Sequence, residues 1–154
     1  WYILQSRDGF RAQQFGALND KPVVGDFDGD GKADVAVYRP SVGTWFIQQS
    51  RDGFAAVQFG NASDKPVPAD YDGDGKTDYA VYRDGFWYLL RTRDGFTGFP
   101  FGVATDLPTP GDFDGDGKAD ISVFRPSDGV WYQLRSQSGF AAAQFGANGD
   151  TPIE

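Results

Sequence analysis

Three acidic segments of nine residues carry the side chains best suited to chemistry in this sequence. The first acidic loop, residues 26–34, reads DFDGDGKAD, and it recurs as the second loop at 70–78 and the third at 112–120. Each copy has aspartate at positions 1, 3, 5 and 9 and glycine at positions 4 and 6. Four carboxylates this close together repel one another, so the folded loop is unfavourable without a cation. The glycines allow the sharp backbone turns that wrap such a loop around an ion.

Calcium is the cation that this arrangement predicts. Ca²⁺ binds hard oxygen donors, which the alternating carboxylates and the main-chain carbonyl of position 7 supply. Aspartate and glycine are also common in solvated hairpin turns, but three copies in register favour a metal site. We therefore expect three calcium sites, one in each loop. The predicted ligands are Asp26, Asp28, Asp30, Lys32 and Asp34, then Asp70, Asp72, Asp74, Lys76 and Asp78, and finally Asp112, Asp114, Asp116, Lys118 and Asp120.

The loop spacing matches the first nine positions of an EF-hand, but the match ends there. Position 12, where an EF-hand has a bidentate glutamate, is Val37, Val81 or Val123. The segments after the loops, such as residues 35–39, are rich in β-branched and aromatic residues and predict strands. No helical period flanks any loop. The sequence therefore predicts calcium loops that connect two strands.

The loops belong to an internal repeat of about 43 residues. An aromatic pair that begins at Trp1, Trp45, Trp87 and Trp131 recurs at steps of 44, 42 and 44, and a Phe-Gly pair keeps the same steps. Residues 1–154 are therefore predicted to form a single repeat region of roughly three and a half units. The parts are a half unit at 1–16, units at 22–60, 66–102 and 108–146, and the start of another unit at 151–154.

Each unit is expected to contain four strands, which in the first complete unit cover residues 22–26, 35–39, 44–50 and 54–59. The Asp-Gly pair of Arg51-Asp52-Gly53 favours a type I′ hairpin turn between the last two strands. The second strand is apolar at nearly every position, so both faces of its sheet should be covered. We predict an all-β fold of tandem four-stranded antiparallel blades of the β-propeller type, with the calcium loop between the first and second strands. An open array of the same units is the alternative.

The order of these motifs resembles the FG-GAP, or VCBS-type, repeat family, which includes the calcium-binding blades of integrin α-subunit propellers. A Phe-Gly pair, the acidic loop and an apolar strand follow one another three times, and the resemblance covers essentially the whole chain. It implies the same aspartate ligands in each loop. The Gly-Ala-Pro element of the family name is absent, and residues 22–25, 66–69 and 108–111 occupy its place. The contact between units is therefore the part that the resemblance leaves open.

The charge balance also points to metal binding. The net charge is −8, and the three loops contain 12 of the 22 acidic residues. Three calcium ions would bring the charge to about −2. The nine arginines and five lysines form no basic patch, so we expect no nucleic-acid partner. No apolar run is long enough for membrane insertion. The chain lacks Met and opens in strand-like residues at Trp1, which predicts a piece of a longer protein.

The predicted function is that of a non-enzymatic extracellular scaffold, structural or adhesive, within a larger surface protein or a self-associating fibre. The chain has no His or Cys, the usual general base and thiol nucleophile. Loops without the position-12 glutamate suit millimolar extracellular calcium. Three and a half units leave strand edges uncovered, which predicts self-association or neighbouring repeats in a longer chain.

A carbohydrate-binding, lectin-like propeller module is the alternative function, with a glycan or a protein as its ligand. The four tryptophans would then be stacking platforms, although their equivalent positions favour packing in the core of each unit. Three arginines, Arg39, Arg83 and Arg125, end the second strands. We expect them to form salt bridges between units or to pair with aspartates.

Overall fold

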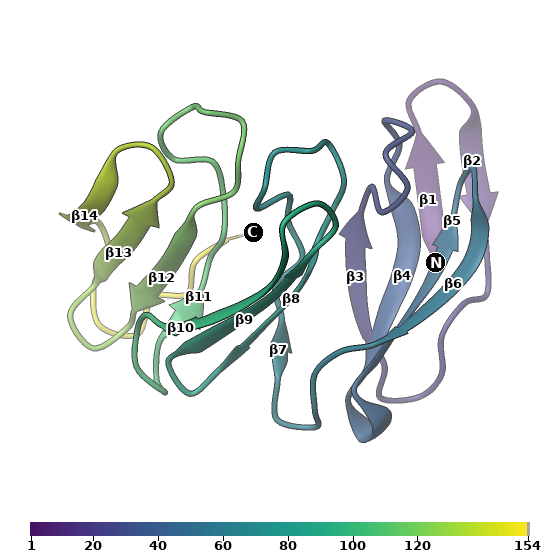
Figure 1. Ribbon diagram of the computed structural model, residues 1–154. Coiled ribbons are helices and arrows are strands. Elements are labelled where there is room, and N and C mark those ends of the chain that lie inside the picture. Colours follow the sequence, from purple (N-terminus) through teal and green to yellow (C-terminus); the bar gives the residue numbers. More distant parts are fainter. Residues whose placement is uncertain (154) are drawn as a thin grey trace.

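The computed structural model describes residues 1–153 and is all-β (Figure 1). A hairpin of β1 (Tyr2–Gln5) and β2 (Gly9–Ala12) precedes three four-stranded antiparallel sheets, in each of which the strands lie in chain order. The prediction of four-stranded antiparallel sheets is confirmed. The first sheet contains β3 (Lys21–Gly25), β4 (Asp34–Arg39), β5 (Thr44–Gln49) and β6 (Gly53–Gln58); the second contains β7 (Lys65–Pro66), β8 (Tyr79–Arg83), β9 (Phe86–Arg91) and β10 (Gly95–Pro100); the third contains β11 (Leu107–Pro108), β12 (Ile121–Arg125), β13 (Val130–Arg135) and β14 (Gly139–Gln144).

The first strand differs in length between the sheets: β3 has five residues, whereas β7 and β11 have two each. The pairing continues past β7 and β11 at two isolated bridges, Ala69 to Asp78 and Gly111 to Asp120, which close the bases of the second and third loops. Pro68 stands between two ladder bonds that are both present, from the N–H of Val67 to the carbonyl of Ala80 and from the N–H of Asp78 to the carbonyl of Ala69. Its missing N–H therefore costs no bond to the second strand, and Pro110 is placed in the same way. Residues 151–153, predicted to start another first strand, form no strand, and residue 154 lies outside the described residues.

The sheets pack face to face, and the second strand of the middle sheet contributes residues to the core clusters on both of its sides. Ala36, Ala80 and Ser122, in the middle of β4, β8 and β12, have no exposed surface. The predicted burial of both faces is therefore confirmed. One core cluster joins residues of the first sheet, including Trp45, to Val81 of the second. A second cluster joins residues of the second sheet to Ile121 and Val123 of the third.

Two of the four tryptophans are core residues rather than surface platforms, whereas Trp1 and Trp131 are partly exposed. Trp45 and Trp87 are fully buried. Their indole N–H groups donate to the carbonyl oxygens of Phe59 (2.8 Å) and Phe101 (3.0 Å), the phenylalanines of the Phe-Gly pairs. A buried indole with its polar group satisfied has no face free to stack on a sugar. The interpretation of these two residues as packing of the repeat is confirmed.

The hairpin turns differ from the prediction in one respect. At Arg51-Asp52-Gly53 only the glycine has positive φ (84°), and Gln49 pairs with Gly53 across the turn. This is a turn with a left-handed glycine in its last position, so the type I′ prediction is wrong there. Asp84 and Gly85 do both have positive φ (48° and 89°) and connect β8 to β9 directly. The register of the strands, rather than the Asp-Gly pair alone, decides the turn type.

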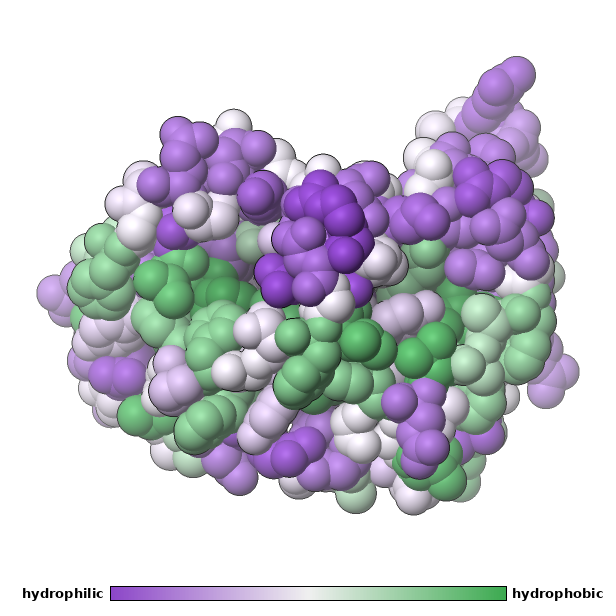
Figure 2. Space-filling view, in the orientation of Figure 1, coloured by the Kyte–Doolittle hydropathy of each residue, from purple (hydrophilic) through white to green (hydrophobic). Residues whose placement is uncertain are grey.

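The three acidic loops lie along one edge of the stacked sheets. Figure 1 shows the connections that follow β3, β7 and β11 rising from the same side of the molecule. Figure 2 shows hydrophilic surface along that rim and apolar surface below it. The fold therefore repeats one loop site at equivalent places in consecutive layers.

Candidate metal centre

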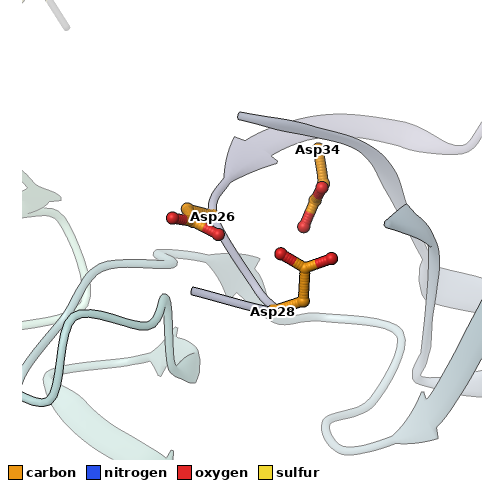
Figure 3. Close-up of side chains that lie close together, drawn as sticks. All are labelled: Asp26, Asp28 and Asp34. Carbon is orange, nitrogen blue, oxygen red and sulfur yellow. The ribbon is translucent and has the colours of Figure 1, made fainter. Parts of the chain in front are cut away.

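Three of the four aspartates in each loop converge. In the first loop, carboxylate oxygens of Asp26, Asp28 and Asp34 all lie within 4.8 Å of one another. Figure 3 shows Asp28 and Asp34 pointing toward each other, with Asp26 beside them. The same arrangement recurs in the other two loops. The matching groups are Asp70, Asp72 and Asp78, and Asp112, Asp114 and Asp120.

The aspartate at position 1 organises the main chain of its own loop. The carboxylate of Asp26 accepts hydrogen bonds from the N–H groups of Gly29 (2.7 Å), Asp30 (3.1 Å) and Gly31 (2.7 Å). Gly29 and Gly31 have φ of 74° and 83°, a conformation that favours glycine. The loop therefore closes around the first carboxylate, and both glycines of the motif are needed for this. Asp70 and Asp112 accept the same three bonds in their loops.

The aspartate at position 9 connects the loop to the rest of its sheet. Asp34 is 2% exposed, and it accepts from the N–H groups of Phe27 (2.9 Å) and Ser50 (2.8 Å). Burial raises the pKa of the Asp34 carboxyl, and the neighbouring charges of Asp28 and Asp26 raise it further. Burial likewise raises the pKa of Asp78. A carboxylate that is buried next to other carboxylates is costly to ionise, so a cation in their midst would stabilise the charged form.

The aspartate at position 3 is held by the hairpin turn between the third and fourth strands. One oxygen of Asp28 accepts from the N–H groups of Arg51 (2.9 Å) and Asp52 (3.1 Å). The guanidinium of Arg51 also donates to the main-chain carbonyl of Asp28. Arg93 and Asp94 repeat these contacts at Asp72. The hairpin thus fixes a candidate ligand from a segment more than twenty residues away in the chain.

The third site lacks the arginine in this hairpin. Gln137 and Ser138 occupy the place of Arg51 and Asp52, and their N–H groups donate to Asp114 at 3.1 and 2.8 Å. The Ser138 hydroxyl adds a bond of 2.9 Å to the same oxygen. The carboxylate is therefore held as in the other loops, but without a neighbouring guanidinium charge.

Two carboxylate oxygens in these sites have no hydrogen-bond partner although they are buried. They are Oδ1 of Asp72 and Oδ1 of Asp114, the position-3 residues of the second and third loops. Leaving a buried carboxylate oxygen unpaired is unfavourable, and native proteins rarely do so without a reason. A cation bound in each of these two triads would satisfy the unpaired oxygen of that triad. The donors are all oxygens, which suits a hard cation such as Ca²⁺ rather than a thiolate- or imidazole-seeking metal.

The fourth aspartate of each loop is held differently. Asp30 accepts from the Ser50 hydroxyl (2.6 Å) and from the N–H of Lys32 (2.9 Å), and it stands outside the converging triad. The hydrogen bond from Ser50 lowers the pKa of Asp30. Asp74 and Asp116 are bound in the same way by Thr92 and Ser136. Metal ligation by position 5 and by the position-7 carbonyl stays a prediction.

Sequence reasoning missed a second set of aspartates that pair with the strand-ending arginines. Asp20 receives both Nε (2.8 Å) and Nη2 (2.9 Å) of Arg39, and this pairing lowers the pKa of Asp20. Asp64 with Arg83 and Asp106 with Arg125 form the same bidentate pair. The expectation of aspartate partners is confirmed: each pair joins the residue directly before the first strand to the end of the second strand of the same sheet. The steps of 44 and 42 from Asp20 to Asp64 and Asp106 were the available signal.

The fold and these sites define a class of protein: a tandem β-repeat in which each four-stranded unit carries an acidic loop between its first two strands. The family model for the FG-GAP-like repeat matches residues 26–81 and 70–123. The chain therefore belongs to the FG-GAP-like repeat family. No curated protein and no solved structure matches the chain. Within residues 1–153, no helix has the length and apolar character needed to cross a membrane.

Proposed function

We propose that this chain is a non-enzymatic calcium-binding repeat scaffold in which each acidic loop holds one Ca²⁺. The observation that carries the proposal is the recurrence of the same carboxylate triad at three equivalent places. The buried oxygens without a partner at Asp72 and Asp114 support it as well, because a cation bound in each triad would satisfy them.

The residues of each triad would act as a clip between three segments of a sheet. Asp26 follows the first strand, Asp34 begins the second, and Asp28 is held by the hairpin at Arg51. When bound, the ion supplies positive charge that offsets three converging negative charges. Metal binding and folding are coupled in such a site, because the unfolded chain does not bring these groups together. The ion therefore has a structural role in this proposal.

We further propose that the stacked sheets are blades of the β-propeller type, and that the scaffold is extracellular and serves a structural or adhesive role. Two features support continued stacking. Phe59 and Phe101 pack against the core clusters, whereas the equivalent Phe145 is 81% exposed. Tyr2 and Leu4 of β1 are also mostly exposed. These apolar surfaces suit another unit, supplied either by a longer chain or by a second copy.

Calorimetry and thermal unfolding with and without calcium test the proposal. We expect binding in the range of about 10⁻⁴–10⁻³ M, as in extracellular modules, and a midpoint of unfolding that rises with calcium. Asp72→Asn should remove one binding site, whereas Asp94→Asn, in the exposed pair with Arg93, should keep all three. Sedimentation velocity on the same samples tests the assembly. Calcium-dependent oligomers are the expected result, and a chain with neither heat of binding nor thermal shift would contradict the proposal.

A further inference from the structure

The first and second acidic loops are joined by a pair of reciprocal hydrogen bonds. The N–H of Thr77 donates to the main-chain carbonyl of Asp26 (2.7 Å). In return, the N–H of Asp26 donates to the Thr77 hydroxyl (2.9 Å). Thr77 belongs to the second loop, at position 8, and supplies no carboxylate of its own. Asp26 is the position-1 residue of the first triad.

The side chain of Lys76 extends the same contact. A Cβ placed on Gly29 of the first loop would lie 3.1 Å from Cγ of Lys76. The second loop therefore covers the first along residues 26–29, the part that closes around the Asp26 carboxylate. Anything that orders residues 76 and 77 should also order this part of the first loop.

The contact between the second and third loops is similar but weaker. The N–H of Ala119 donates to the carbonyl of Asp70 (2.7 Å), but alanine has no hydroxyl to accept a bond in return. Lys118 lies against Gly73 as Lys76 does against Gly29. The chain thus provides two versions of one contact, with and without the hydroxyl.

From these contacts we propose that Thr77 is a positioning residue for Asp26, and that the first and second loops consequently bind calcium cooperatively. The inference rests on the proposed calcium function. A fixed main chain at Asp26 lowers the ordering cost of binding in the first loop. Because coupling between two sites is reciprocal, calcium in either loop raises the affinity of the other by the same factor. The coupling should be smaller between the second and third loops.

Amide NMR resolves the three sites in a single calcium titration. The N–H groups of Gly31, Gly75 and Gly117 each donate to the position-1 aspartate of their own loop, at 2.7, 2.8 and 2.9 Å. Their shifts should therefore follow the filling of each loop separately. Gly117 provides an internal control, because the hydrogen bonds of Thr77 to another loop go to the first loop rather than to the third.

Thr77→Val removes the hydroxyl and keeps the branched shape. We expect the midpoint at Gly31, the calcium concentration at which the Gly31 amide shift is half complete, to rise by about threefold to tenfold, the usual effect of losing one hydrogen bond. The corresponding concentration for Gly117 should stay unchanged. Thr77→Ser keeps the hydroxyl and should behave as the parent chain does. A midpoint at Gly31 that is the same in all three chains, or a Ser variant as defective as the Val variant, would overturn the role of Thr77.

Disabling the second loop tests the coupling itself. Asp72→Asn should raise the midpoint at Gly31 in the parent chain but have little further effect when Thr77→Val is already present. Asp114→Asn, the matched change in the third loop, should leave Gly31 nearly unaffected. If Asp72→Asn does not move Gly31, the loops bind independently and the inference fails although the calcium function stands. If the parent chain shows no calcium response, the proposed function fails as well.

Discussion

Asp64 shows how a carboxylate outside the metal triads stabilises this fold. Its side chain is fully buried, and it receives Nε and Nη2 of Arg83 at 2.6 and 2.9 Å. It also accepts from the N–H of Asn61 (2.8 Å) in the segment that leads into β7. Asp64 therefore both pairs with a guanidinium charge and accepts a hydrogen bond from the main chain. The charge is tolerated because each carboxylate oxygen has a partner.

We predict that Asp64→Ala lowers the free energy of unfolding by about 2 kcal/mol, because it leaves the guanidinium and a main-chain N–H without their acceptor. The side chain of Arg83 is 31% exposed, so water compensates for part of the loss. Urea unfolding at a fixed calcium concentration measures the change. Asp52→Ala, in an ion pair that is about half exposed on both sides, is the control. Its loss of stability should be much smaller, because water screens an exposed pair, and an equal loss in both variants would refute the argument.

At the scale of the strands, a glycine in the turn between the second and third strands allows a close main-chain contact. A Cβ on Gly43 would lie 2.2 Å from the carbonyl oxygen of Gly60, and Gly43 itself has φ of 60°. Gly85 and Gly129 face Gly102 and Gly146 in the same way. The turn between the second and third strands therefore lies directly against the Phe-Gly segment after the fourth. Only glycine fits at this contact.

Gly43→Ala should consequently destabilise the chain by about 3 kcal/mol, because an unfavourable φ adds to a clash with main-chain atoms. Gly53→Ala provides a matched control: its φ is 84°, but no atom lies within 4 Å of the added Cβ. The control should lose about 1 kcal/mol from the backbone conformation alone. Chemical denaturation of the three chains gives the comparison. Losses of similar size would show that crowding at Gly60 is unimportant.

The sequence predicted these elements well because the repeat exposes them several times. The acidic loop, the apolar second strand and the Phe-Gly pair all recur in register, and three sheets appear where they indicate. The bracing of Asp28 by Arg51 was not predicted, and neither was the identity of Asp20 as the aspartate that pairs with Arg39. These residues are 23 and 19 positions apart, so their proximity depends on how the strands pair rather than on local pattern. Local composition also misled at Gly53, where strand register decides the turn.

At the scale of the whole molecule, the question is what fixes the order of the layers. The loops touch at Gly25 and Thr77 between the first two sheets, and a Cβ on Gly25 would lie 2.6 Å from the threonine side chain. At the next contact Ala69 stands in place of Gly25, and Ala119 stands in place of Thr77. A small residue faces a larger one at the first contact, whereas two alanines share the space at the second. The two residues at each contact are complementary in size, so each layer fits its own neighbour better than it would fit another layer.

This matching predicts that the effects of two substitutions are not additive. Gly25→Ala alone should destabilise the contact by about 1–3 kcal/mol through overpacking against the branched side chain of Thr77, whose hydroxyl is engaged by the N–H of Asp26. Thr77→Ala alone should cost about 1 kcal/mol through the lost hydrogen bond. The double variant recreates the alanine pair of the next contact, so it should be more stable than the sum of the two losses by about 1–2 kcal/mol. Denaturant unfolding of the four chains completes the cycle. Strictly additive losses would mean that the layers accept any neighbour of the same fold, and that their order is set by chain connectivity alone.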